Sequence, residues 1–339
     1  MPEPLEILSA RSVSFGGRRG TAYRMLRPHT VTGDAELDRA LATVRVLVFA
    51  PPDAERAPVV TLLQGITAPL ERSGPLVAPL LDAGLGLVLF DTPLGGERRA
   101  GSGPRGSELA EIGRRADLAL DVAFASRLFD GVALDFPAAL GLAAERHGLV
   151  EGVGGRLALF GVSFGCLLSS LAFGRDGLGQ RLIGACGHAN LPAMARGLAQ
   201  TSATWAGVPD ALIGPALAAG PALLPVLERA ARARGGDTAV GVLRLAVLLA
   251  RLGRGGRAVQ SFNPVTFADR VGPARRVTFL TGDADSVATP AETQTAASRY
   301  VTNAFRLVPG LGHGWRVRGP GTFAEDCTAL ILEALADWR

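Results

Sequence analysis

The segment 161–165, with sequence GVSFG, constrains this chain more than any other stretch. An apolar run at residues 157–160 precedes it, and a run compatible with a helix follows at residues 166–173. This order predicts a buried strand, a sharp turn that carries Ser163, and then a helix, which is the context of a nucleophile elbow. The serine backbone of such a turn is strained, and only glycines let the helix and the neighbouring strands approach closely. Because the chain holds 44 glycines, the motif can also arise by chance, so its interpretation depends on the rest of the sequence.

Short apolar runs alternate with stretches of helical length from residue 59 onwards. The runs are largely apolar on both faces, as expected for strands that helices cover on both sides of a sheet. They occupy residues 59–63, 85–90, 157–160, 182–186, 277–280 and 305–308. The helical stretches are residues 75–83, 107–129, 136–147, 163–173, 291–300 and 322–338. Repeated βα units of this kind predict an α/β fold with a doubly wound, mostly parallel sheet.

Two further strands are predicted before this alternation begins, at residues 5–15 and 43–50. In the second, Val44, Val46 and Val48 share one face, and two prolines at residues 51–52 end the strand. The segment between the two strands is interpreted as a connection. We expect an antiparallel pair here that leads into the parallel sheet.

The interval between residues 186 and 276 is too long for a single βα unit. It has about ninety residues, where such a unit needs about thirty. Residues 225–233 and 240–252 are predicted as helices, and Pro225 stands at the opening turn of the first. We therefore expect a helical cap at residues 188–263, inserted into an α/β core of residues 1–187 and 264–339. Extra packing helices are the alternative, whereas an apolar cap above a reactive site would enclose a dry substrate pocket.

Composition argues against several classes of function. All 35 basic residues are arginines, the net charge is only +4, and no basic patch with interleaved aromatic residues occurs, so nucleic acid is not the expected partner. Three widely spaced cysteines without a CxxC pair indicate neither a zinc site nor a disulfide framework. The start of the chain lacks a signal-peptide pattern, and its apolar stretches are too short or too interrupted to span a membrane. We expect a cytoplasmic protein that needs no metal or organic cofactor.

An acid and a histidine follow the elbow serine in the order that a serine nucleophile of this type requires. Asp285 and Asp283 both lie in the turn after the strand predicted at 277–280, where an aspartate could orient a histidine, and Asp285 is favoured. Each could instead stabilise an Asx turn or cap a helix. His313 lies in a glycine-rich loop after the last predicted strand, a place that offers no core role. Of the other three histidines, His29 and His147 are expected to be structural or solvated.

Two backbone N–H groups are candidates for an oxyanion hole, the site that binds the negative charge formed during acyl transfer. They belong to Phe164, which follows the serine, and to Ile66, in the loop after the strand predicted at 59–63. Further residues are candidates for lining a substrate pocket: Gln64, Thr67, His188 and Trp315. His188 could instead have a hydrogen-bonded structural role.

The chain resembles the α/β-hydrolase family over nearly its whole length, from about residue 5 to residue 338. The resemblance is carried by GVSFG at 161–165, GDADSVATP at 282–290 and PGLGHGW at 309–315. It departs from the family at Gln64, where the oxyanion loop usually has a histidine before the glycine. The segment DTPLGGER at 91–98 is similar to the abhydrolase domain-containing 18 branch. The resemblance also implies a cap at the interval described above.

Together these features predict a serine hydrolase that cleaves a carboxylic ester or a related acyl compound. Ser163 would attack the carbonyl, His313 would accept its proton, and Asp285 would fix the imidazole tautomer. A serine in the elbow argues against the dehalogenase and epoxide-hydrolase chemistries of the family, which the resemblance associates with aspartate. A peptidase or amidase with the same three residues is an alternative, and so is a binding protein without catalysis. The expected partner is a small acyl or ester substrate, and the oligomeric state is left open.

Overall fold

The computed structural model describes residues 6–26, 38, 42–66, 68–93, 122–205, 224–313 and 320–338. These residues contain one sheet of nine strands, in the order β1-β2-β3-β5-β4-β6-β7-β8-β9. The strands are β1 (Glu6–Phe15), β2 (Arg18–Leu26), β3 (Thr43–Phe49), β4 (Val59–Leu63), β5 (Gly86–Phe90), β6 (Leu157–Val162), β7 (Arg181–Ala185), β8 (Arg276–Ala284) and β9 (Asn303–Gly312). The pairs from β1 to β5 are antiparallel, and β5, β4 and β6 to β9 run parallel. The predicted α/β class with a mostly parallel sheet is therefore confirmed.

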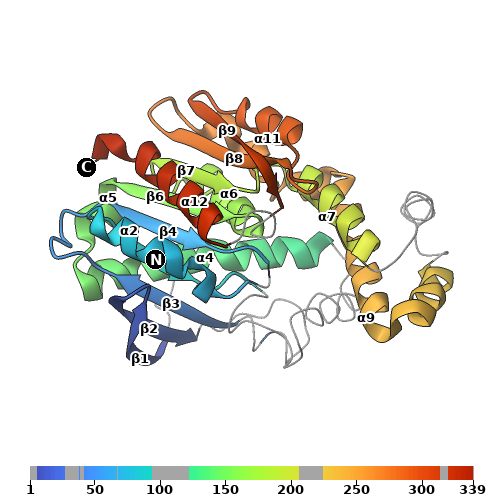
Figure 1. Cartoon of the computed structure of the whole chain (residues 1–339), viewed down its shortest axis with the longest axis horizontal. Coiled ribbons are helices and arrows are strands. Elements are labelled where there is room, and N and C mark those ends of the chain that lie inside the picture. The colour runs from blue at the N-terminus through green and yellow to red at the C-terminus, as the bar shows by residue number, and fades with distance from the viewer. Residues whose placement is uncertain are drawn as a thin grey trace.

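Helices cover both faces of this sheet (Figure 1). Those described, with the short 3-10 helices marked η, are η1 (Leu70–Ser73), α2 (Gly74–Asp82), α4 (Val122–His147), α5 (Val150–Gly155), α6 (Phe164–Gly174), α7 (Leu191–Trp205), α9 (Leu224–Gly253), α10 (Arg257–Gln260), η5 (Pro264–Arg270), α11 (Pro290–Ala297), α12 (Pro320–Ala334) and η6 (Ala336–Trp338). Successive side chains of β4 alternate between two cores. Val59 and Leu63 pack in the core with α4 and α6, whereas Val60 and Leu62 pack in the core with α2 and α12. The strands are thus apolar on both faces because each face is buried.

The amino-terminal region contains a strand that the sequence interpretation missed. Residues 16–42 were expected to connect two strands, but β2 lies within them and pairs with both β1 and β3. Gly16 and Gly17 join β1 to β2 with φ values of 54° and 75°, the left-handed conformation that a tight hairpin turn requires. This glycine pair between two extended segments was a usable hairpin signal. The expected antiparallel pair of the strands at 5–15 and 43–50 does not form, because β2 lies between them and is antiparallel to both; antiparallel pairing does precede the parallel strands, since β3 is also antiparallel to β5.

Two predicted helices are joined into one. Helix α4 runs without interruption from Val122 to His147, across residues 130–135, where a break between two helices had been expected, and it also passes through Pro137. A proline removes one hydrogen-bond donor from a helix. Here Phe136 and Ala139, on either side of it, are fully buried, so core packing holds the helix in place. The part of the first predicted helix at residues 107–121 lies outside the described residues.

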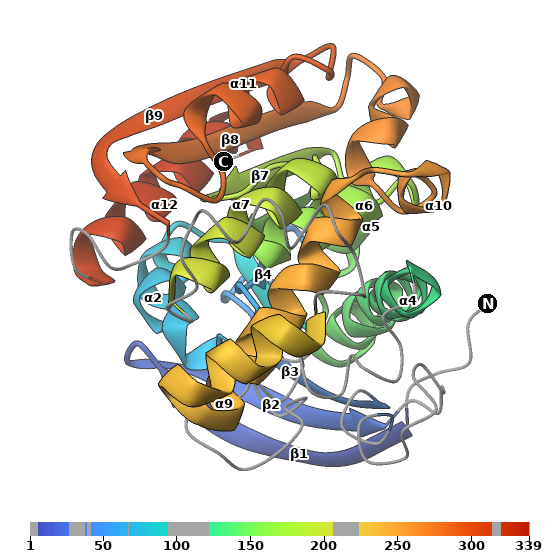
Figure 2. The same ribbon diagram turned by 90° about the vertical axis from the view of Figure 1, so that its right-hand side faces the viewer.

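The long interval between β7 and β8 is helical in its described part, and α7 and α9 lie beyond the carboxyl ends of the parallel strands (Figures 1 and 2). Helix α9 turns back on itself at Gly236, whose φ of 63° interrupts the helical backbone. The contact between Arg244 Nε and Glu228 Oε1, at 2.7 Å, shows that the two arms lie side by side. Residues sixteen apart in a straight helix would be separated by about 24 Å. The two arms correspond to the helices predicted at 225–233 and 240–252. Helix α7 has no counterpart among the predicted helices.

None of the described helices combines the length and the apolar character that crossing a membrane would require. Cys166, Cys186 and Cys327 are all buried with free thiols.

Candidate active site

Ser163 occupies a strained turn between β6 and α6. Its backbone has φ 52° and ψ −115°, a conformation that side-chain-bearing residues rarely adopt. A Cβ atom at Gly161 would overlap the carbonyl group of Gly165. A Cβ atom at Gly165 would lie 2.5 Å from the carbonyl oxygen of Leu63, in β4. Both glycines of the motif are therefore needed for the helix to pack this closely on the strands, as the elbow interpretation requires.

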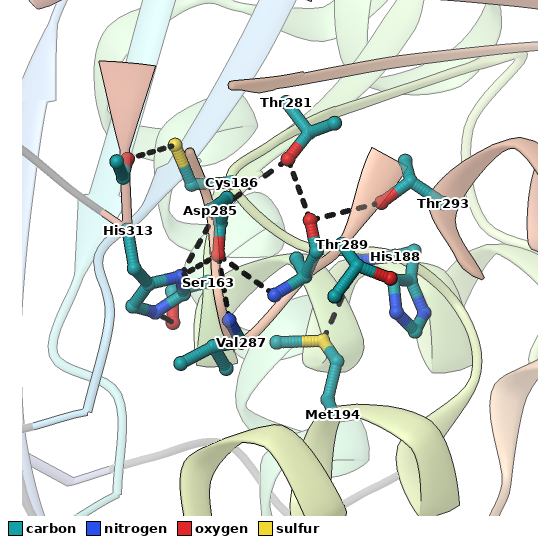
Figure 3. Close-up of polar contacts among 12 residues, drawn as sticks. Ser163, Cys186, His188, Met194, Thr281, Asp285, Val287, Thr289, Thr293 and His313 are labelled. Atoms are coloured by element: carbon teal, nitrogen blue, oxygen red, sulfur yellow. Dashed lines mark hydrogen bonds and ion pairs between the residues drawn. The ribbon is translucent and has the colours of Figure 1, made fainter. Parts of the chain in front are cut away.

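Three side chains meet at the carboxyl ends of the parallel strands (Figure 3). The Ser163 hydroxyl lies 2.9 Å from His313 Nε2. On the other side of the ring, His313 Nδ1 lies 3.0 and 3.1 Å from the two carboxylate oxygens of Asp285. A carboxylate can only accept a hydrogen bond, so it keeps the ring proton on Nδ1 and leaves Nε2 with a lone pair that can accept the hydroxyl proton of the serine. The arrangement can thus move a proton from Ser163 to His313.

The carboxylate of Asp285 is held by its own turn. It is buried, and its Oδ1 accepts hydrogen bonds from the backbone N–H groups of Val287 at 2.9 Å and Ala288 at 2.8 Å. Thr281 Oγ1 lies 3.4 Å from Oδ2 and donates to the Ala288 carbonyl at 2.7 Å. These contacts fix the position of the carboxylate. Sequence reasoning missed Thr281 and the two N–H donors, because nothing in the residue pattern distinguishes them.

The competing acid has a different partner. Asp283 is exposed, and its Oδ1 accepts the backbone N–H of Gly310 at 2.7 Å. No hydrogen bond joins Asp283 to His313 among the described residues. The structure therefore brings Asp285, rather than Asp283, to the imidazole.

The two candidate oxyanion donors both lie near the serine. Phe164 is the first residue of α6, so its N–H has no partner within the helix. The loop after β4 reaches Ser163, because a Cβ atom at Gly65 would lie 3.8 Å from the serine Oγ. In the described part of the chain, neither the Phe164 N–H nor the Ile66 N–H donates to a protein acceptor.

The candidate pocket residues have mixed positions. The Gln64 side chain is buried and its Nε2 donates to Ser73 Oγ at 2.7 Å, so it ties the loop to η1. His188 is also fully buried, and its Nδ1 accepts the Asn190 N–H at 3.1 Å. Burial lowers the pKa of His188 to about 4, so the ring is neutral near pH 7. Figure 3 shows this ring apart from Ser163 and His313. The other two candidates, Thr67 and Trp315, lie outside the described residues.

Helix α7 packs directly on the turn that carries the acid. A Cβ atom at Gly197 of α7 would lie 2.6 Å from the carbonyl oxygen of Val287. On the same helix, Arg196 donates to the Gly253 carbonyl at 2.8 Å and lies 3.5 Å from Glu292 in α11. Helix α7 is thereby joined both to the end of α9 and to the segment that follows Asp285.

Comparison with known proteins finds likeness in structure but not in sequence. No protein-family model and no curated protein matches this chain. An acetyl xylan esterase from Paenibacillus sp. R4 has a TM-score of 0.54 at 15% identity, over 98% of this chain and 89% of that one. The esterase Pf2001 from Pyrococcus furiosus has a TM-score of 0.51 at 12% identity, over 98% and 91%. An acylaminoacyl peptidase from Pyrococcus horikoshii has a TM-score of 0.52 at 10% identity, and the match spans 98% of this chain but 42% of the peptidase.

At these identities the likeness concerns the fold and not the substrate. No comparison tests the narrower resemblance to the abhydrolase domain-containing 18 branch, which stays a prediction. Three observations indicate the same fold: the order of strands in the mixed sheet, the helices on both of its faces, and the structural neighbours. This chain has the α/β-hydrolase fold.

Proposed function

We propose that the protein is a serine hydrolase that cleaves a carboxylic ester or a related acyl compound through an acyl-enzyme on Ser163. The observation that carries this proposal is the continuous hydrogen-bonded chain from Ser163 Oγ through both ring nitrogens of His313 to Asp285. The strained backbone of Ser163 adds support, because such strain is retained where the surrounding structure imposes it and clusters at active sites.

The proposed reaction has two halves. In the first, Ser163 Oγ forms a bond to the carbonyl carbon while His313 Nε2 takes the hydroxyl proton, and the carbonyl oxygen becomes an oxyanion. The N–H groups of Phe164 and Ile66 donate to this oxyanion, each worth on the order of 3 kcal/mol. His313 then protonates the leaving alcohol as the carbon–oxygen bond of the ester breaks. In the second half, His313 activates a water molecule that hydrolyses the acyl-enzyme, and Ser163 recovers its proton.

Asp285 has a supporting role in this scheme. Its carboxylate keeps the Nδ1 proton of His313 in place and stabilises the imidazolium that forms when the ring accepts the serine proton. The two backbone N–H groups that bind Oδ1 keep the carboxylate in the orientation that this role requires.

The helices at residues 188–263 act in this proposal as a cap on a core of residues 1–187 and 264–339. The position of α7 and α9 beyond the carboxyl ends of the strands supports this role (Figure 2). Among the described residues of the cap, most of the buried side chains are apolar, and they include Leu191, Met194 and Leu243. An apolar cap excludes water from the reaction and suits an uncharged acyl group.

A fluorophosphonate probe tests the nucleophile. We expect it to label the wild-type protein but not the Ser163→Ala variant, and we expect the variant to lose about 10⁴- to 10⁶-fold in kcat on p-nitrophenyl esters. Circular dichroism of the variant serves as the control for folding. A wild-type protein that folds but is neither labelled nor active would contradict the proposal and favour a binding protein. A parallel panel of aminoacyl p-nitroanilides distinguishes an esterase from an amidase or peptidase, since the two share the mechanism.

A further inference from the structure

Strand β9 contains a bulge just before its last residue. Its ladder with β8 pairs Gly282 with Val308 and next pairs Ala284 with Gly312. Two steps along β8 thus correspond to four steps along β9, so Asp283 alone faces residues 309–311. A bulge bends its strand and changes the direction of the side chains that follow. The bulge therefore sets the direction in which β9 delivers the histidine that comes next.

The bulge is held tightly against β8 at two points. A Cβ atom at Gly282 would overlap the Leu311 carbonyl group, so the two backbones are in close contact there. Gly310 has φ 70°, and its N–H donates to Asp283 Oδ1 at 2.7 Å. The carboxylate thus supplies the acceptor that the interrupted ladder does not offer to this N–H group.

We propose that Asp283 is a positioning residue that acts through His313. By holding the bulge, its carboxylate determines where the His313 imidazole lies relative to Ser163. Asp283 does not touch the ring, whose partners are Ser163 Oγ and the carboxylate of Asp285. The two aspartates of the turn therefore have different roles, since Asp285 orients the imidazole ring and Asp283 orients the backbone that carries it. This inference rests on the proposed function, because it assigns a role within the same site.

The test compares Asp283→Ala with Asp283→Asn, whose amide oxygen can still accept the Gly310 N–H. We expect the alanine variant to lose about 10- to 100-fold in kcat on p-nitrophenyl acetate with KM nearly unchanged, which is the effect of one hydrogen bond to a charged group. Its Gly310 amide should exchange hydrogen faster by a similar factor. The asparagine variant should stay within about threefold of wild type in both measurements. Asp53→Ala, at an exposed aspartate in another turn, is the control and should change neither.

Several outcomes would overturn the inference. They are a kcat within twofold of wild type in Asp283→Ala, a loss of kcat without faster exchange at Gly310, and an asparagine variant as impaired as the alanine variant. If the alanine variant does not fold, Asp283→Ser replaces it, because the serine side chain is one atom shorter than that of aspartate and places no oxygen at the Oδ1 position. A wild-type protein without esterase activity or probe labelling would defeat the proposed function. Even then, the exchange rate of Gly310 in the same variants would show whether Asp283 holds the bulge.

Discussion

Replacement of Asp285 by asparagine tests the proton arrangement at the site most directly. Oδ1 of Asp285 accepts two backbone N–H groups, from Val287 and Ala288, and these donors would fix the amide oxygen of an asparagine in the same place. The amide NH2 group would then take the place of Oδ2, 3.1 Å from His313 Nδ1, although the amide oxygen at the Oδ1 position stays 3.0 Å from the same nitrogen. Because NH2 can only donate, it would disfavour a proton on Nδ1 and shift the ring toward the tautomer with the proton on Nε2. In that tautomer the ring cannot accept the proton of Ser163.

The structure predicts that asparagine and alanine at position 285 differ in their effects on activity and on stability. For Asp285→Asn we expect kcat to fall by about 10⁴-fold, the size of effect that a wrong imidazole tautomer has in serine hydrolases. The free energy of unfolding should change by less than about 1 kcal/mol, because both backbone donors keep an acceptor. Asp285→Ala removes that acceptor and leaves two buried N–H groups unpaired. At about 1 to 3 kcal/mol each, the alanine variant should lose about 2 to 6 kcal/mol of stability.

Two assays distinguish these effects. Steady-state hydrolysis of p-nitrophenyl acetate gives kcat, and urea denaturation followed by circular dichroism gives the free energy of unfolding. An Asp285→Asn variant with kcat within tenfold of wild type would refute the tautomer argument. An asparagine variant as unstable as the alanine variant would show that the two backbone N–H groups do not hold the carboxylate.

Two further predictions concern stability and are measured by urea denaturation. Gly165→Ala should lower the free energy of unfolding by about 3 kcal/mol, because the added Cβ would lie 2.5 Å from the β4 backbone. In the control Gly154→Ala the added Cβ meets nothing within 4 Å, so the free energy of unfolding should fall by less than about 1 kcal/mol. Equal effects of the two substitutions would contradict the packing argument. Burial lowers the pKa of His188 from 6.5 to about 4, so the unfolded chain binds a proton first as the pH falls. The contribution of His188 to the free energy of unfolding should be constant above about pH 6.5 and should decrease by about 3 kcal/mol toward pH 4. His188→Asn should remove this contribution to the pH dependence. A wild-type protein and variant with identical pH profiles would refute it.

The sequence predicted most of what depends on local pattern. The elbow at 161–165, the parallel strands and the helices α2, α6 and α12 follow from apolar periodicity and glycine spacing, which act within a few residues. The missed strand β2 has mixed burial, because its first residues are exposed arginines, so its residues lack a regular alternation. The continuous helix α4 depends on core contacts that override the local effect of Pro137.

The arrangement of the site needed information that no local pattern contains. Asp283 and Asp285 lie two residues apart in the same short segment of the sequence. The pattern of that segment favoured Asp285 without showing why. The reason is a register shift between β8 and β9, which places Gly310 opposite Asp283 and His313 beside Asp285. Such a shift depends on how residues far apart in the sequence pair, so it becomes visible only in the folded chain.

Close backbone contacts join the parts of the site. A Cβ atom at Gly165 would meet the carbonyl at the end of β4, one at Gly187 would lie 2.8 Å from the Ser163 carbonyl oxygen, and one at Gly197 would lie 2.6 Å from that of Val287. Backbones packed this tightly cannot shift independently of one another. The elbow, the loop after β4, the acid turn and α7 are therefore packed against one another with no room for an added side chain at these glycines.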